Sequence, residues 1–162
     1  MTSITAILHT HNDALRLGRC LETLYPCDSI VVVDRESRDG TVHIAREYGA
    51  HVLPAGGSSP LDILRSHRSG AWGWILALDP RESLTESLAA SLFEWKTEAQ
   101  GANREVPGAV FLREETADGW IQVPFPQTRL VPPTWNRWSG DLPVHDPEAV
   151  ALEGELLRFV FP

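Results

Sequence analysis

The chain has 162 residues, which suits one domain with its own hydrophobic core, so we expect a single domain over residues 1–162. The formal net charge of −8 argues against nucleic acid or an anionic membrane as a partner. No apolar run is long enough to cross a bilayer, and the first residues lack the pattern of a signal peptide. The two cysteines, Cys20 and Cys27, predict a reduced, cytoplasmic protein.

The first half of the chain alternates between strand and helix patterns. Strands are predicted at residues 4–8, 30–33 and 51–53, and helices at residues 17–24 and 40–48. This order predicts right-handed crossovers and a parallel sheet. Asp34 stands at the carboxyl end of the second strand, and Asp39 can cap the helix that follows. Because open α/β sheets bind ligands at this edge, we expect a site for a ribose or a base beside Asp34.

The middle of the chain supplies another strand that ends in a carboxylate. Residues 61–71 have partial helical spacing, and residues 73–78 predict a strand that ends at Asp79. Residues 83–86 have the form of a capping box, which predicts that a helix begins there. Residues 100–107 are polar and predict a loop. Asp34 and Asp79 should therefore converge on one cleft at the edge of the sheet.

The second half predicts a smaller antiparallel portion. Strand patterns cover residues 108–113, 120–123, 127–131 and 156–161, and Asp118-Gly119 predicts a hairpin turn. The whole pattern is that of an α/β fold, with a mostly parallel sheet and a small antiparallel portion near residues 108–131.

The first-half motifs resemble those of family 2 glycosyltransferases, which have the GT-A fold. Residues 32–41 read V-V-D-R-E-S-R-D-G-T, which resembles the first nucleotide-contact loop of that family. Residues 10–13, T-H-N-D, stand where the family has T-x-N-E. The resemblance implies a GT-A-like three-layer fold and a nucleoside-diphosphate sugar as donor, UDP-linked. The residues that it assigns to the donor site here are Thr10, Asn12, Asp34, Ser37 and Asp39, with Asp79 at the ribose or the donor phosphate.

The metal-binding motif of the family is altered in this chain. Members of the family end the strand with W-x-L-x-L-D-A-D-E, in which the second Asp binds a divalent cation, whereas residues 74–82 read W-I-L-A-L-D-P-R-E. Arg81 replaces the metal-binding Asp, and a guanidinium offers no oxygen ligand and repels a cation. Three readings stay open. Arg81 neutralises the leaving diphosphate; or Asp79 and Glu82 hold Mg²⁺ or Mn²⁺ with help from His145; or the chain has lost catalysis and at most binds.

The second-half motifs resemble one branch of the same family, the short enzymes related to glucosyltransferases of lipopolysaccharide-core synthesis. That branch carries P-x-x-Q-x-R-L-F, R-W-x-G and V-H-E, and residues 126–131, 137–140 and 144–146 read P-Q-T-R-L-V, R-W-S-G and V-H-D, with a shorter first spacing. The resemblance implies that Asp146 takes the proton from an acceptor hydroxyl in an inverting displacement, and that His145 binds metal or diphosphate. Arg65 and Arg129 would contact the donor diphosphate, although Arg129 could equally be a salt-bridged strand residue.

Two functional hypotheses follow. The first is a glycosyltransferase that moves a sugar to a hydroxyl acceptor, in cell-envelope polysaccharide or lipopolysaccharide synthesis. The second is an inactive relative that serves as a nucleotide-sugar-binding or assembly module. A nucleotidyltransferase is a weaker third option, because residues 9–13 lack the glycine-rich basic loop of that class. The oligomeric state stays open, with a homodimer among the options.

Overall fold

The computed structural model describes residues 2–56, 59–67, 73–98 and 105–162. The helices in these ranges are α1 (Ala14–Leu21), α2 (Thr41–Glu47), α3 (Pro60–His67) and α4 (Glu86–Glu98). The strands are β1 (Ile4–Thr10), β2 (Ser29–Asp34), β3 (His51–Pro54), β4 (Trp74–Leu78), β5 (Glu82–Leu84), β6 (Gly108–Thr116), β7 (Gly119–Gln122), β8 (Gln127–Val131), β9 (Trp138–Ser139), β10 (Leu142–Pro143) and β11 (Val150–Arg158). Within the described ranges, the main sheet has the order β3-β2-β1-β4-β8-β6-β11-β5, with β7 paired to β6, while β9 and β10 form a separate ribbon.

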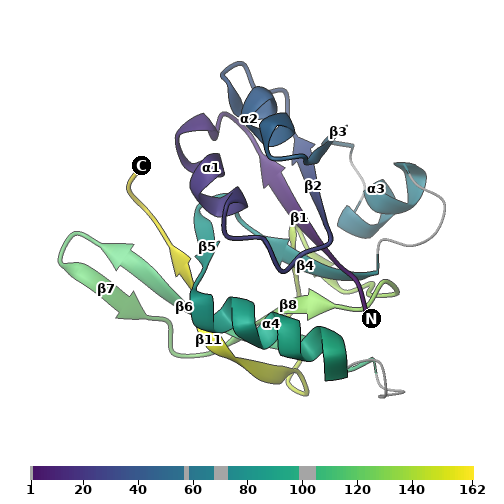
Figure 1. Cartoon of the computed structure of the whole chain (residues 1–162), viewed down its shortest axis with the longest axis vertical. Coiled ribbons are helices and arrows are strands. Elements are labelled where there is room, and N and C mark those ends of the chain that lie inside the picture. The colour runs from purple at the N-terminus through teal and green to yellow at the C-terminus, as the bar shows by residue number, and fades with distance from the viewer. Residues whose placement is uncertain (1, 57–58, 68–72, 99–104) are drawn as a thin grey trace.

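The strands β3, β2, β1 and β4 form the parallel part of the sheet (Figure 1). Every residue of β1 is buried, because this strand lies inside the sheet and has packed elements on both faces. Thr10 of β1 pairs in register with Asp34 of β2, and Leu8 pairs with Leu78 of β4. The carboxyl ends of the three strands therefore meet at one edge, and the predicted α/β sheet is confirmed.

The remainder of the sheet mixes both directions. β8 runs antiparallel to β4 and β6, and β7 forms an antiparallel hairpin with β6. β11 runs parallel to β6 and antiparallel to β5. The antiparallel portion predicted near residues 108–131 is present, and it reaches further than predicted because β5 and β11 join it.

Two hydrophobic cores lie on opposite faces of the parallel strands. On one face, Leu8 and Val32 pack with residues of α1, α2 and α4. On the other, Ile7 and Val33 pack with Leu64 of α3 and with Trp135. The result is the three-layer arrangement predicted for this fold. None of the helices in the described ranges is long and apolar enough to cross a membrane.

Two elements depart most from their predicted bounds. The helix predicted to start near residue 83 begins at Glu86, because residues 82–84 form β5 and pair with β11, a partner that local sequence does not reveal. The hydroxyl of Thr85 accepts the Leu88 N–H at 3.3 Å and caps α4 in place of Ser83. The last strand occupies Val150–Arg158 rather than residues 156–161. The predicted helix residues 68–71 and loop residues 100–104 lie outside the described residues.

Candidate donor site at the carboxyl edge of the sheet

Asp34 lies at the end of β2 with a carboxylate that its neighbours hold in one orientation. Its Oδ1 accepts hydrogen bonds from the hydroxyls of Thr10 (2.7 Å) and Ser37 (2.6 Å), and its Oδ2 accepts the Ser37 N–H (2.9 Å). Although partial burial opposes ionisation, these hydrogen bonds hold the pKa of the Asp34 carboxyl below its ordinary value. The structure thus brings three of the predicted donor-site residues together around one ionised group.

Asn12 and Asp39 join the two loops that follow β1 and β2. The backbone N–H of Asn12 donates to Ser37 Oγ at 2.8 Å, and Asn12 Oδ1 accepts the Arg38 N–H at 2.8 Å. Asp39 accepts N–H groups at the starts of both α1 and α2, from Ala14 (3.2 Å) and from Thr41 (3.0 Å). Asn12 has a φ of 52°, a left-handed conformation that Asn tolerates well. Both side chains therefore shape the loops around Asp34.

Asp79 lies just beyond the end of β4 and is paired with Arg81. Arg81 Nε donates to Asp79 Oδ1 at 2.9 Å, and Nη2 donates to Oδ2 at 3.2 Å. Burial opposes ionisation of Asp79, but the hydrogen bonds and charge of Arg81 lower the pKa of its carboxyl. Arg81 thus engages both oxygens of the Asp79 carboxylate, the group that the resemblance assigns to the donor site.

Glu82 lies at the centre of a buried charge cluster. Its Oε1 accepts Arg129 Nη1 at 2.7 Å, and its Oε2 accepts Arg129 Nη2 at 2.9 Å and Arg158 Nη2 at 2.9 Å. The side chains of Glu82 and Arg129 are 0% and 1% exposed. The expected metal role of Glu82 does not fit these contacts, because both oxygens are committed to arginines. The diphosphate role of Arg129 does not fit either, and the salt-bridged alternative describes this residue.

His145 and Asp146 are anchored to the start of β8. The hydroxyl of Thr128 lies 2.9 Å from His145 Nδ1 and accepts the Asp146 N–H at 2.9 Å. Asp146 accepts the Glu148 N–H at 2.8 Å and Arg137 Nη2 at 2.5 Å, and these contacts lower the pKa of its carboxyl. β8 runs antiparallel to β4, with Leu130 opposite Leu76, so the start of β8 lies at the carboxyl end of β4. Asp146 is therefore an ionised carboxylate at the same edge of the sheet as Asp79. Arg65 is exposed on α3 and has no comparable anchor at this edge among the described residues.

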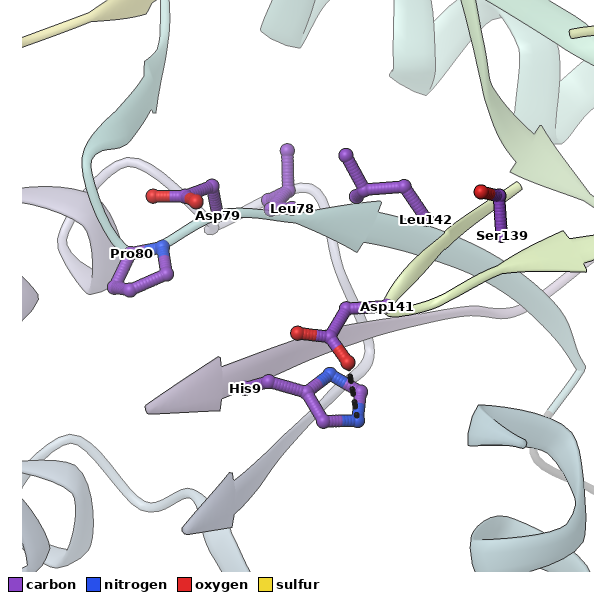
Figure 2. Close-up of a pocket in the computed structure, with 7 residues that line it drawn as sticks. All are labelled: His9, Leu78, Asp79, Pro80, Ser139, Asp141 and Leu142. Carbon is purple, nitrogen blue, oxygen red and sulfur yellow. Dashed lines mark ion pairs between the residues drawn. The ribbon is translucent and has the colours of Figure 1, made fainter. Parts of the chain in front are cut away.

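A cavity of about 220 Å³ lies between the ends of β1 and β4 and the β9–β10 ribbon. Figure 2 shows its lining, with His9 reaching up from β1 toward Asp141 of the ribbon. The lining residues are His9, Leu78, Asp79, Pro80, Ser139, Asp141 and Leu142. Asp34 is not among these lining residues. Asp34 and Asp79 therefore lie at the same edge of the sheet, as expected, but in the described part of the chain they do not line one cavity together.

His9, Arg35 and Asp141 were missed by sequence reasoning. Arg35 Nη1 and Nη2 bind the carboxylate of Asp141 in a two-pronged ion pair at 3.0 Å and 2.5 Å. His9 Nε2 lies 3.7 Å from Asp141 Oδ1. Arg35 and Asp141 are 106 residues apart, so no local motif joins them. Of the three, only His9 is marked in the sequence, because it is a polar residue at the end of an apolar strand pattern.

The described residues do not offer a site that suits a divalent cation. No group of three His, Cys, Asp or Glu side chains is close enough together in the described ranges to hold a metal ion. Mg²⁺ and Mn²⁺ need several oxygen ligands, whereas Asp79 is paired with Arg81 and Glu82 is enclosed by arginines. The predicted set of Asp79, Glu82 and His145 is therefore not assembled.

Sequence comparison finds relatives over part of the chain. An uncharacterized glycosyltransferase of Rickettsia prowazekii is 32% identical over 94 residues, which cover 54% of this chain and 31% of the relative. A TPR repeat-containing protein of Synechococcus elongatus is 32% identical over 130 residues, which cover 77% of this chain and 30% of the relative. The chain thus spans about a third of the length of the curated relatives it matches. No family model matches the chain.

Structure comparison finds a solved protein with a similar fold. The solved structure of residues 1–349 of Staphylococcus aureus TarS matches 76% of this chain and 38% of its own length, with a TM-score of 0.51 and 19% identity. At this identity the match is evidence of the fold. The predicted GT-A fold is confirmed, whereas the assignment to family 2 and to its lipopolysaccharide-core branch stays a prediction. The chain is thus similar in sequence to a curated glycosyltransferase over 94 residues, and it has the GT-A fold.

Proposed function

We propose that the chain is a glycosyltransferase domain that transfers a sugar from a UDP-linked donor to a hydroxyl acceptor. The donor would lie along the carboxyl edge of β2, β1 and β4, with its nucleoside at Asp34. Membership of family 2, a cytoplasmic location and a role in envelope polysaccharide synthesis belong to the same proposal. The chain spans only about a third of its curated relatives, so the activity of a whole protein is part of this proposal.

The observation that carries this proposal is the state of the Asp34 carboxylate. An ionised carboxylate has about four acceptor positions, and Thr10 and Ser37 use three of them. The fourth remains for an N–H or O–H donor of a ligand, and the group is already oriented and ionised. The imide N–H of uracil and the hydroxyls of ribose are donors of this kind. Pre-orientation lowers the entropy lost on binding, which favours a specific nucleoside contact.

Asp146 is suited to the proton transfer that glycosyl transfer requires. Asp146 is ionised at neutral pH, as an aspartate is at its ordinary pKa or below it, so its carboxylate is available to accept the proton of an acceptor hydroxyl. The freed oxygen then attacks the anomeric carbon as the bond to the diphosphate breaks, and UDP leaves with that electron pair. Arg137, which pairs with Asp146, has to yield room for the acceptor during this step.

The leaving diphosphate gains negative charge and needs a cation. The described residues do not fit a metal here, so we assign this role to Arg81, whose side chain is 39% exposed and pairs with Asp79, a residue that lines the cavity. Arg81 uses Nε and Nη2 on Asp79, and Nη1 remains for a phosphate oxygen. A guanidinium fixed in this way stabilises the developing charge without a metal.

The pairing of Asp79 with Arg81 also favours the second candidate, a nucleotide-sugar-binding module without turnover. The pair has no net charge and blocks the carboxylate that would hold a cation. Such a module would bind UDP-sugars through Asp34 and leave them intact.

Calorimetric titration with UDP and UDP-glucose, followed by a donor-hydrolysis and transfer assay, tests both candidates. Asp34→Asn should weaken UDP binding about 10- to 100-fold, because a hydrogen bond to a charged group contributes about 1.5–3 kcal/mol. Asp118→Asn, a matched change in the exposed β6–β7 turn, should leave UDP affinity unchanged. Turnover that persists in EDTA supports the metal-free enzyme, and binding without turnover supports the module. If neither UDP nor UDP-glucose binds the wild type, the proposed function is wrong.

A further inference from the structure

His9 is a buried imidazole whose hydrogen bonds are incomplete. Its side chain is only 5% exposed, and its buried Nδ1 has no hydrogen-bond partner among the described residues. Nε2 lies 3.7 Å from Asp141 Oδ1, which is longer than a hydrogen bond. Buried polar groups are nearly always satisfied, and each exception calls for an explanation. Here the imidazole lines a cavity, so a ligand in that cavity can satisfy it.

The lining of the cavity indicates which ligand that is. The carboxylates of Asp79 and Asp141 and the hydroxyl of Ser139 accept hydrogen bonds, while Leu78, Pro80 and Leu142 add apolar surface. This mixture suits a ring that carries hydroxyl groups on an apolar frame. No arginine or lysine is among the described lining residues, which disfavours a phosphate in the same space, and the described side chains form no metal-binding group. At about 220 Å³, the cavity is below the roughly 300–1,000 Å³ of pockets for larger ligands, so one ring fits better than a whole nucleotide sugar.

The position of the cavity favours the transferred sugar of the donor, rather than its ribose, as the ligand. Across the edge of the sheet, Asp34 ends β2, His9 lies on β1, Asp79 follows β4, and Thr128 of β8 anchors Asp146. His9 and Asp79 therefore lie between the group proposed for the nucleoside and the group proposed as base. The sugar that is transferred must occupy this intermediate place, because its anomeric carbon meets the acceptor on one side and the diphosphate on the other.

We propose that His9 and Asp141 form a hydroxyl-binding subsite that holds the transferred sugar of the donor. This inference rests on the proposed function and names the residues that read the sugar. Arg35 is a positioning residue, since its two-pronged pair with Asp141 fixes that carboxylate and the β9–β10 ribbon over β1. A neutral imidazole offers one donor and one acceptor, and Asp141 offers acceptors only, so the pair can bind adjacent hydroxyls and distinguish their orientation.

The test compares binding of UDP with binding of UDP-glucose, UDP-galactose and UDP-N-acetylglucosamine. For the sugar nucleotide that binds the wild type best, we expect His9→Gln and Asp141→Asn to raise the ratio of its Kd to that of UDP about tenfold, the loss of one good hydrogen bond. Asp118→Asn in the exposed β6–β7 turn is the matched control and should not change the ratio. An unchanged ratio in both subsite variants overturns the proposal. So does an equal loss for UDP and the sugar nucleotide, which would place the ribose in the cavity.

Nitrogen NMR of the His9 ring in the wild type makes the test independent of variants that fail to fold. We expect the sugar nucleotide to shift the Nδ1 or Nε2 signal and UDP alone to leave it in place. If UDP and all UDP-sugars fail to bind, the proposed function fails, and the subsite is then titrated with methyl glucoside and methyl galactoside. A saturable His9 shift with either glycoside supports a hydroxyl-binding subsite. The absence of any shift overturns it.

Discussion

Arg81 points its guanidinium back at Asp79, with Nε 2.9 Å from Oδ1 and Nη2 3.2 Å from Oδ2. In the resemblance to family 2 glycosyltransferases, Arg81 stands at the position of a metal-binding aspartate, and here it also engages the neighbouring Asp79. By that resemblance, one substitution removes an oxygen ligand, adds a cation and neutralises a second ligand. This relationship explains why the edge of β4 does not suit a divalent cation although Asp79 is kept.

Reversing the substitution should restore metal binding. Arg81→Asp adds a carboxylate and frees Asp79, so we expect the variant to bind Mn²⁺ at least about tenfold more tightly than the wild type, as electron paramagnetic resonance titration of free Mn²⁺ can measure. Arg38→Asp makes the same charge change at an exposed loop position and should not increase Mn²⁺ affinity. Tight Mn²⁺ binding by the wild type that Arg81→Asp does not improve would contradict the prediction.

Removal of the Glu82 carboxylate should strongly destabilise the fold. Glu82→Gln leaves Arg129 buried without its counter-ion, and breaking a buried pair in this way costs about 3–5 kcal/mol. Urea unfolding followed by circular dichroism measures the loss. Glu114→Gln removes a partner of Arg158 that is 35% exposed, and it should cost no more than about 1 kcal/mol. Similar losses of unfolding free energy in Glu82→Gln and Glu114→Gln would show that the buried Glu82–Arg129 pair does not contribute more to stability than the exposed one.

His9 should make stability depend on pH in the range near neutrality. Burial lowers the pKa of His9 below 6.5; the charge of Asp141 acts in the opposite direction, and that of Arg35 in the same direction as burial. As pH falls, His9 therefore takes up a proton in the unfolded chain before it does so in the folded one. Its contribution to the unfolding free energy is complete above about pH 6.5 and is lost as pH falls through the pKa of His9 in the folded state.

The unfolding free energy of the wild type should therefore fall more steeply between pH 7.5 and pH 5 than that of His9→Gln. Urea unfolding of both proteins at several pH values measures the difference, in which the contributions of the other histidines cancel. The carboxylates with lowered pKa, among them Asp34 and Asp79, act at lower pH because their ordinary value is 3.8. Parallel pH profiles for the two proteins would show that His9 is not the titrating group.

Gly154 should not tolerate a side chain. It has a φ of +95° in the irregular part of β11, and an added Cβ would lie 2.3 Å from the backbone nitrogen of Leu88 in α4. Gly154→Ala should cost more than about 1 kcal/mol, because both the backbone angle and the helix contact oppose it. Thermal unfolding measures the effect. Gly56→Ala, with open space around it, is the control and should change stability by less than about 0.5 kcal/mol. An equal effect at both positions would contradict the close approach of β11 to α4.

The alternation of strands and helices in the first half was predictable because it depends on residues close in sequence. The buried Val31, Val32 and Val33 mark β2, and Gly49 ends the second helix with a φ of +77°. The start of α4 was misplaced for the opposite reason. Residues 82–84 are drawn into a strand by the residues of β11 that pair with them, which lie more than 70 positions later, and no local pattern reports such a partner.

The sequence by itself determined which carboxylates end the parallel strands, and therefore that Asp34 and Asp79 lie at one edge of the sheet. Only the tertiary structure decided what each charged group does there. Glu82 meets Arg129 across 47 residues and Arg158 across 76, and Arg35 meets Asp141 across 106. The positions of the strands follow from local hydrophobic pattern, and their parallel direction follows from the strand-helix-strand order. A charge instead takes its role from the partner that folding brings to it, and this partner is fixed by the packing of the whole sheet.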